Sequence, residues 1–190
     1  MLIATTALLA LLNGQLLTPI VVLDGEVEDK TTAPLVAFMA NAAAYHIPTV
    51  VLFIDSPGGE DAAGFALVDS MRAAQKAGVE IVCMAEHAAS MAAVIFEACS
   101  VRKMHVGGQI MFHESAYGML IGTPGARLTK TALAAFILEL ARDDEREASI
   151  VAPRVHMTIK QYMDWTAGQD RYLGAAEALS RGFIDGIVVP

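Results

Sequence analysis

The sequence is poor in positive charge, in aromatic side chains and in cysteine. Its 190 residues include 13 Lys and Arg against 21 Asp and Glu, for a net charge of −8, and no run of basic residues occurs. This balance argues against non-specific nucleic-acid binding, which needs clustered positive charge. The chain also has no glycine-rich phosphate loop, so any use of ATP must belong to a partner protein.

No apolar run in the sequence is long enough to span a bilayer. The first dozen residues are apolar apart from Thr5 and Thr6, but the run ends at Asn13, well short of the ~20 residues needed. The segment has no basic start and no Ala-x-Ala-like site, so it does not resemble a secretion signal. We expect no membrane partner. Residues 1–18 are predicted to be a short apolar N-terminal segment, in which Leu8–Leu17 forms a helix against a neighbouring subunit.

Cysteine occurs only at Cys83 and Cys99, both within apolar segments. Their spacing is not that of a CxxC metal or redox motif. They are therefore interpreted as reduced residues of the protein core, which is typical of a cytoplasmic protein. No metal and no cofactor are expected.

Hydrophobic side chains, by contrast, are abundant, at 55% of the residues with a mean hydropathy of +0.48. This is high for a soluble monomer and predicts that apolar surface is buried between the subunits of a homo-oligomer. The length suits a single domain over residues 1–190, large enough for a substantial core.

The hydrophobic pattern alternates between strands and helices, without repeats or low-complexity linkers, and so predicts an α/β fold. The sequence Thr158–Gln161 matches a capping box, and Gly78 is a helix stop. Strands are expected at Ile20–Leu23, Val50–Ile54, Val79–Met84, Gly107–Phe112 and Ile184–Val189. Helices are expected at Thr32–Tyr45 with Pro34 in the first turn, Asp61–Lys76, Met91–Ala98, Thr131–Val151, after Thr158, and at Ala175–Arg181, and Tyr117–Pro124 is expected to be a loop or short strand.

One serine, Ser90, stands between two apolar segments among small neighbours. The segment Val79–Met84 predicts a strand before it, and Met91–Ala98 predicts a helix after it. A strand that turns directly into a helix places the serine oxygen at the helix N-terminus, where unpaired N–H groups and the helix dipole favour a developing negative charge. A nucleophile would lie at such a position, although a simple helix N-cap is an ordinary alternative role for serine.

A nucleophilic serine needs a general base, an acid that orients the base, and N–H donors for the oxyanion. The base candidate is His113, which follows a predicted strand. The donor candidate is the loop Ser56–Gly59, because its two glycines allow the backbone to approach a ligand closely. The acid candidate is Asp170, just before the C-terminal helix pattern.

Each assignment has a competitor. His87 is the rival base, but it lies three residues from Ser90 on a tight turn and would approach the oxygen from the wrong side. The rival acids are Asp164, expected on an exposed helix face, and Asp185, in a turn where aspartate commonly caps backbone amides. The charged run Arg142–Glu147 is interpreted as a solvated helix surface with intrahelical ion pairs.

Five sequence blocks resemble, in order and at nearly the same spacing, those of the Clp protease family of proteolytic subunits, also called ClpP. The likeness runs from about Ile20 to the C-terminus. The blocks are LDGEVED (Leu23–Asp29), IDSPGG (Ile54–Gly59), AASM (Ala88–Met91), the MFH that ends at His113, and QDRYLGAAEALSRGFIDGI (Gln169–Ile187). One block alone would be weak evidence, whereas five in order are specific.

The resemblance implies a set of catalytic roles. Ser90 is implied as the nucleophile, His113 as the general base and Asp170 as the acid that orients the base. The oxyanion hole is implied to consist of the backbone amides of Gly59 and Met91. The expected activity is that of a serine endopeptidase, an ATP-independent peptidase core that hydrolyses peptide bonds of unfolded polypeptides.

The substrate of such an enzyme is expected to bind as an added strand. Its neighbours are expected to be Gly58 and Glu60 on one side and Tyr117 and Gly118 on the other. Because this binding recognises the backbone more than the side chains, low sequence specificity is expected.

The resemblance also implies a fold and an assembly. The fold is the ClpP/crotonase-like α/β fold of repeated β-β-α and βα units, with a projecting helical handle over residues 125–160 for ring stacking. Stacked heptameric rings would enclose the sites, and an ATP-driven unfoldase is a possible partner. The expected location is the cytoplasm.

The chain departs from the family's pattern close to the site. Ala92 and Glu86 replace glycines near the serine, Glu114 and Ser115 follow the histidine where the family has Gln-Pro, and Gln169 replaces an arginine of an inter-ring ion pair. These changes predict a bulkier turn at the serine, a loop after the histidine without proline stiffening, and an altered contact between rings.

Three alternatives from other classes stay open. Crotonase-like enzymes share the general fold and hold acyl-CoA thioesters with a similar pair of amides, but they use carboxylates, and the chain has no obvious basic site for the CoA phosphates. A catalytically silent ring subunit would keep the assembly without the chemistry. A Ser/Lys dyad would need a lysine buried near Ser90, whereas Lys103 is expected in a charged turn.

Overall fold

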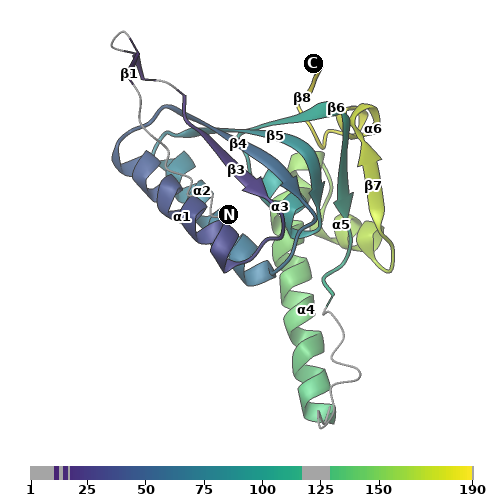
Figure 1. Cartoon of the computed structure of the whole chain (residues 1–190). Helices are drawn as coiled ribbons and strands as arrows, with labels where there is room; N and C mark the ends of the chain where they lie inside the picture. Colours follow the sequence, from purple (N-terminus) through teal and green to yellow (C-terminus); the bar gives the residue numbers. More distant parts are fainter. Residues whose placement is uncertain (1–10, 13–14, 17, 117–128, 190) are drawn as a thin grey trace. The chain divides into compact units, whose positions relative to one another are not determined.

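The computed structural model describes residues 11–12, 15–16, 18–116 and 129–189. They form two compact units: the first takes its residues from 1–112 and 172–190, and the second from 113–171. The described residues contain a six-stranded sheet and six α-helices (Figure 1). The predicted α/β fold class is therefore confirmed.

A mainly parallel sheet forms the core of the first unit. The strand order is β3-β4-β5-β6-β7, and β8 pairs with β6. The pairs β3–β4, β4–β5, β5–β6 and β6–β8 are parallel, so the carboxyl ends of β3 to β6 lie at one edge of the sheet. The strands are β3 (Ile20–Asp24), β4 (Thr49–Ser56), β5 (Glu80–Ala89), β6 (Val101–Phe112), β7 (Arg171–Gly174) and β8 (Gly186–Val188).

Two long helices, α1 (Asp29–Ala44) and α2 (Asp61–Lys76), lie together on one face of this sheet (Figure 1). The short helices α3 (Met91–Glu97) and α6 (Ala175–Ser180) belong to the same unit. Alternate side chains of β3 and β4 are fully buried, as expected for strands covered by helices on one side. The buried members are Val21, Leu23, Val50, Leu52 and Ile54.

Helix α1 begins earlier than its sequence pattern predicts. Glu28 is the N-cap and forms a capping box with Thr31, whose Oγ1 accepts a hydrogen bond from the Glu28 N–H at 3.1 Å. Pro34 consequently lies inside α1 rather than in its first turn, and it removes one N–H from the hydrogen bonds of the helix.

Strand β6 also begins earlier than expected because it contains a bulge. Ala85 of β5 pairs with Met104, whereas His87 pairs with Gln109, so β6 has extra residues between these pairs. Gly108 lies in this extra length, where a Cβ atom would be 2.6 Å from the carbonyl oxygen of Glu86. Gly107 was predicted to begin the strand, but Gly107 and Gly108 lie inside β6. The absence of a side chain at Gly108 therefore allows β5 and β6 to approach closely.

The N-terminal segment differs from its prediction. Leu11–Leu12 (β1) and Gln15–Leu16 (β2) form a short antiparallel pair. The prediction of a helix over Leu8–Leu17 is therefore wrong for these four residues, and its other positions lie outside the described residues. The predicted loop Tyr117–Pro124 lies outside them as well.

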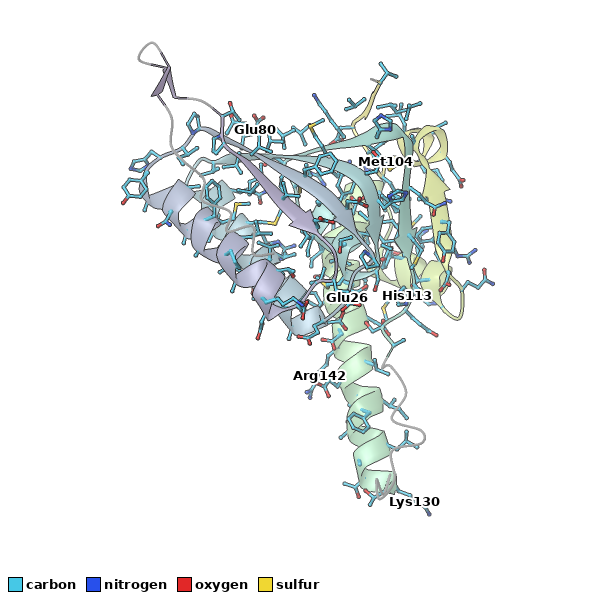
Figure 2. The ribbon with its side chains drawn as sticks, in the orientation of Figure 1. Glu26, Glu80, Met104, His113, Lys130 and Arg142 are labelled. Atoms are coloured by element: carbon cyan, nitrogen blue, oxygen red, sulfur yellow. A yellow bond between two sulfur atoms is a disulfide. The ribbon has the colours of Figure 1, made fainter. Side chains whose placement is uncertain are left out.

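The second unit consists of helices and their connections. It contains α4 (Lys130–Val151), a 3-10 turn (Ala152–Val155) and α5 (Ile159–Thr166). The capping box that was predicted at the start of α5 is present. Figure 2 shows Lys130 at the first turn of α4 and Arg142 farther along the helix. No helix among the described residues is long and apolar enough to cross a membrane.

Cys83 and Cys99 form a disulfide with a Cα–Cα distance of 5.9 Å. The prediction that both are reduced is therefore wrong. The reason is topological: from Cys83 the chain continues along β5, turns at Ser90 and returns through α3, which brings Cys99 back beside the strand. The cysteines thus give no argument for a reducing compartment.

A buried charged network connects three parts of the first unit. Arg102 of β6 contacts Glu97 at the end of α3 through Nη1 at 2.5 Å, and Asp185 before β8 through Nη2 at 2.8 Å. Asp185 also accepts the backbone N–H of Arg102 at 2.8 Å, so it caps a backbone amide as its turn position predicted. Burial acts to lower the pKa of Arg102, but the hydrogen bonds and charges of Asp185 and Glu97 outweigh it and raise that pKa above its ordinary value.

Replacing Arg102 with methionine is expected to reduce the free energy of unfolding by ~3–5 kcal/mol, because the buried Glu97 carboxylate loses its guanidinium partner. The matched control is Arg181→Met, which removes a partly exposed pair with Glu177 and the contact of Arg181 with the Phe183 ring, and is expected to cost ~1–2 kcal/mol. Urea unfolding measures both. Equal losses in the two variants would contradict a stabilising role for the buried network.

Candidate active site

The turn between β5 and α3 holds Ser90 in an unusual backbone conformation. Its φ of 55° and ψ of −129° lie in a region that non-glycine residues rarely adopt. Hydrogen bonds fix this residue from both sides: its N–H donates to the carbonyl of Met111 at 2.9 Å, and its carbonyl accepts from Ala93 at 2.9 Å. The predicted strand-turn-helix around Ser90 is therefore confirmed.

The Ser90 side chain makes no N-cap hydrogen bond to α3. The structure therefore does not support the alternative role of Ser90, in which its side chain would cap the amides of α3. The residue is partly exposed, and its successor Met91 is the first residue of α3. The N–H groups at this end of a helix have no acceptor within the helix, so they are suited to hold an anion.

The loop Ser56–Gly59 packs so closely against this turn that a side chain has no room at Gly58. A Cβ atom at Gly58 would lie 2.6 Å from both the Ala89 carbonyl oxygen and the Ser90 Cβ, and 3.1 Å from the Met91 nitrogen. The φ of Gly58, +94°, is also one that L-residues rarely adopt. Only glycine fits here, and this explains why a glycine loop accompanies the serine.

The position of Gly59, the last residue of the loop, is fixed by hydrogen bonds between its two neighbours and Val27. The Val27 N–H donates to the Gly58 carbonyl at 2.8 Å, and the Glu60 N–H donates to the Val27 carbonyl at 2.7 Å. A Cβ atom at Gly59 would lie 2.3 Å from the Val27 oxygen. These bonds fix the loop and thereby the direction of the Gly59 amide.

The residues predicted to bind substrate fall in two regions. Gly58 belongs to the loop just described, and Glu60 directly follows that loop. The Gly58 carbonyl accepts from Val27, and the Gly58 N–H donates to Ser56 Oγ at 3.2 Å. The Glu60 N–H donates to the Val27 carbonyl. Tyr117 and Gly118 lie outside the described residues.

In the second unit, His113 directly follows β6, as predicted. Its Nδ1 lies 2.5 Å from the carbonyl oxygen of Glu114. Because a carbonyl only accepts hydrogen bonds, this contact places the ring hydrogen on Nδ1 and leaves Nε2 as the acceptor. This is the tautomer that a general base for a serine requires.

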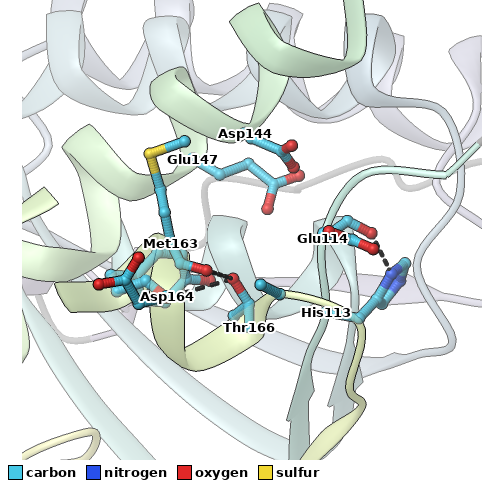
Figure 3. Close-up of a pocket in the computed structure, with 9 residues that line it drawn as sticks. His113, Glu114, Asp144, Glu147, Met163, Asp164 and Thr166 are labelled. Atoms are coloured by element: carbon cyan, nitrogen blue, oxygen red, sulfur yellow. Dashed lines mark hydrogen bonds between the residues drawn. The ribbon is translucent and has the colours of Figure 1, made fainter. Parts of the chain in front are cut away.

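His113 lines a cavity of about 250 Å³ within the second unit (Figure 3). Figure 3 shows the carboxylates of Asp144 and Glu147 entering this space from α4, with Thr166 of α5 and His113 at other positions on its wall. Its lining residues are His113, Glu114, Asp144, Glu147, Tyr162, Met163, Asp164, Thr166 and Ala167.

Asp170 is exposed and lies between α5 and β7, in the same unit as His113. It is not one of the described residues that line the cavity. Its rivals have other contacts: Asp164 pairs with Lys160 at 2.7 Å on an exposed helix face, as predicted, and Asp185 pairs with Arg102.

Comparison with known proteins gives a consistent result. The family model described as Clp protease matches residues 8–190. A protein named ATP-dependent Clp protease proteolytic subunit from Streptococcus equi subsp. equi (strain 4047) is 32% identical over 172 residues, 89% of this chain and 84% of that protein. One with the same name from Streptococcus pyogenes serotype M5 (strain Manfredo) is 31% identical over the same shares.

The chain belongs to the Clp protease family. The resemblance found in the five sequence blocks is confirmed, and this family member is a protease. In this Clp protease, Ser90, Gly59 and Met91 belong to the first unit, and His113 and Asp170 belong to the second.

The sequence interpretation missed two acidic residues of this Clp protease. Asp144 and Glu147 fall in the run that was interpreted as a solvated surface, but Glu147 is only 6% exposed, and Asp144 accepts the Ser115 N–H at 2.6 Å. The interpretation holds for Arg142, Glu145 and Arg146, which are exposed, but it is wrong for Glu147 because it considered only charge. Spacing was the available signal: Leu140, Asp144, Glu147 and Val151 recur at helical intervals and continue one helix face.

His87 and Lys103 were the alternatives to His113 as the base in this Clp protease. His87 is exposed and lies 3.1 Å from Asp55 through its Nδ1. Lys103 is exposed within β6 rather than in a charged turn. Within the residues described, no three His, Cys, Asp or Glu side chains are grouped to hold a metal ion.

Gly58→Ala is expected to reduce stability more than Gly78→Ala does. Both glycines have nearly the same φ, +94° and +95°, so the backbone penalty is matched, but a Cβ at Gly78 has nothing within 4 Å. Gly58→Ala should therefore lower the melting temperature by several degrees more, since a collision costs ~1–3 kcal/mol beyond the backbone term. Thermal unfolding of both variants measures this difference, and equal shifts would contradict close packing at the Ser90 turn.

Proposed function

We propose that this member of the Clp protease family is a serine endopeptidase in which Ser90 attacks the peptide carbonyl. The observation that carries the proposal is the Ser90 backbone, held at a positive φ on the turn between β5 and α3. Such a conformation costs about 1–3 kcal/mol and is concentrated at functional sites. A serine that served only to start α3 would have no need of it.

His113 acts as the general base of this reaction. Its tautomer supports the role, because Nδ1 carries the hydrogen toward the Glu114 carbonyl and Nε2 is left to accept the Ser90 proton. The backbone amides of Gly59 and Met91 hold the oxyanion, each donor contributing ~3–4 kcal/mol in comparable sites. Asp170 is the acid that the family resemblance implies, and that role stays a prediction.

The substrate is an unfolded polypeptide that binds as an extended strand. The glycine loop supports this, since Gly58 and Glu60 lie on a segment that already forms a parallel bridge between Val27 and Gly59. Tyr117 and Gly118 are proposed to contact the other side of the substrate. Backbone recognition of this kind makes the specificity low.

The Clp protease is also proposed to assemble into stacked heptameric rings in the cytoplasm, with an ATP-driven unfoldase as partner. Parallel sheets are normally covered on both faces, yet Ile20 and Val22 of β3 are 64% and 44% exposed. On α4, Leu133, Ile137 and Leu138 are exposed as well. The relatives' name, ATP-dependent Clp protease proteolytic subunit, supports a subunit that works with others.

His113→Ala is expected to reduce peptide hydrolysis by at least ~100-fold, because the general base is lost. The matched control is His87→Ala, which removes the rival histidine and should leave turnover nearly unchanged. Hydrolysis of a fluorogenic peptide measures both. In parallel, a fluorophosphonate probe should give one adduct on the wild type and none on Ser90→Ala by intact-mass analysis.

The outcomes separate the alternatives. Near-normal turnover in His113→Ala with loss in His87→Ala would assign the base to His87. An assembled, folded wild type that forms no adduct would identify a catalytically silent ring subunit.

Native mass spectrometry is expected to show rings of seven subunits or pairs of such rings. The exposed apolar side chains of α4 make a specific prediction: replacing Ile137 and Leu138 with glutamate should weaken the contact that the handle makes in the assembly. The control is Glu139→Gln, which alters an exposed residue of the same helix without adding charge. A monomer in the wild type would refute the proposed assembly.

A further inference from the structure

Asp170 belongs to a short loop whose own contacts do little to fix it. The loop, residues 167–170, connects α5 to β7, and all of its residues are exposed. Within the part of the chain that the structure describes, the Asp170 side chain has no hydrogen bond or ion pair. Gly168 lies in the middle of the loop with a φ of +65°, and glycine has the most conformational freedom of any residue. The position of the Asp170 carboxylate therefore depends on what fixes the two ends of the loop.

The side chain of Arg171 joins these two ends. Arg171 is the first residue of β7, and its Nε–H donates to the carbonyl oxygen of Trp165 near the end of α5. Its guanidinium carbon also lies 5.6 Å from the centroid of the Trp165 ring, which is a cation–π distance. One side chain thus makes two different contacts with the same residue, and together they close the loop that contains Asp170.

The end of α5 is a favourable place for a cation. Carbonyl groups in the last turn of a helix lie at the negative end of the helix dipole, and arginine side chains often bind them. Two neighbouring carbonyls in this turn accept from the loop itself: Met163 accepts from the Ala167 N–H at 3.0 Å, and Thr166 accepts from the Gln169 N–H at 3.1 Å. Arg171 adds a charged donor at the same helix end, where a charge-assisted hydrogen bond is stronger than a neutral one.

Trp165 in turn is attached to the wall of the His113 cavity. Its ring lies 6.0 Å from the ring of Tyr162, which is buried. Tyr162, Thr166 and Ala167 line the same cavity as His113, and Figure 3 labels Thr166 and His113 on its wall. The loop of Asp170 therefore starts from a helix that forms part of the surroundings of the base, and all of these residues belong to the second unit.

We propose that Arg171 and Trp165 are positioning residues for the catalytic acid, and that their contact, the Arg171–Trp165 clamp, holds the Asp170 loop in the conformation that the reaction needs. The inference rests on the proposed serine mechanism with Asp170 as its acid. Neither residue touches the reacting atoms or exchanges a proton. A carboxylate that is already in place stabilises the imidazolium without reorganisation, whereas a carboxylate on a loose loop is misplaced for part of the time.

The clamp can be tested directly because Trp165 is the only tryptophan of the chain. Arg171→Met removes both contacts and keeps a side chain of similar reach. We expect the acrylamide quenching constant of the tryptophan fluorescence to rise by about twofold, because the guanidinium no longer covers one face of the ring. The matched control is Arg181→Met, which removes a guanidinium at the same 5.6 Å from the Phe183 ring and should leave the quenching unchanged.

The second readout is the hydrolysis of a fluorogenic peptide. Arg171→Met should lower kcat about tenfold with KM changed by no more than about twofold, because the acid acts on the imidazolium and not on substrate binding. Trp165→Leu keeps the carbonyl but loses the ring, so it should have a smaller effect of about threefold. Trp165→Phe restores an aromatic face and should recover most of that loss, and Arg181→Met should leave kcat unchanged.

A double-mutant comparison separates positioning from a purely structural effect. Asp170→Asn is made first, and Arg171→Met is then added to it. If Arg171 acts through Asp170, the second change should lower kcat by no more than about a further twofold, because no carboxylate is left to position. A general disturbance of the fold would instead reduce kcat by the same factor in both backgrounds.

The inference and the proposed function fail in different ways. Unchanged quenching in Arg171→Met overturns the clamp. A wild-type kcat in that variant, or the full loss of kcat on top of Asp170→Asn, overturns the positioning role and leaves the serine mechanism in place. Full activity in Asp170→Asn, or a wild type without a fluorophosphonate adduct, overturns the proposed function and the positioning role with it, while the quenching still decides whether the clamp exists.

A second variant covers the case in which Arg171→Met does not fold. Arg171→Lys keeps the positive charge but lacks the planar guanidinium that makes both contacts. It should show the same pattern of raised quenching and lowered kcat, with smaller changes in both. A wild-type result in both measurements would overturn the clamp.

Discussion

The contact between the glycine loop and the turn at Ser90 is the constraint on which the first unit depends. Gly58 lies so close to Ala89 and Ser90 that no side chain fits between the two segments. The approach is possible only because β4 and β5 are parallel neighbours whose carboxyl ends reach the same edge of the sheet. The positive φ of Ser90 then follows from the need to enter α3 directly after that edge. Oxyanion donors and nucleophile are thus fixed by the same packing.

Local features of this fold could be predicted because they depend on neighbouring residues. The strand, turn and helix around Ser90 and the capping box of α5 both follow from short patterns, and both are present. Features that depend on distant pairing could not. The bulge of β6 arises from its register with β5, and the Cys83–Cys99 disulfide arises because α3 returns beside that strand. The disulfide leaves no mark on residues adjacent in sequence, and Gly108 marks the bulge only once the register of β5 and β6 is known.

The same distinction between local and long-range features applies to the candidate site. His113 could be found because a histidine at the end of a buried strand is a local signal. Glu147 was missed because a run of charged residues normally faces water, and only the continuation of the Leu140 face along α4 distinguished it. Charge composition describes a segment as a whole, but burial is decided face by face. In a helix that is apolar at one end and charged at the other, periodicity is therefore the better guide.

The carbonyl that holds His113 has a consequence for where the acid can lie. When one carboxylate both orients and stabilises a histidine, it must lie within hydrogen-bond distance of Nδ1. Here Glu114 supplies the orientation from the adjacent residue, so it follows the histidine wherever the strand ends. The acid that stabilises the imidazolium then has to supply charge near the ring rather than the hydrogen bond to Nδ1.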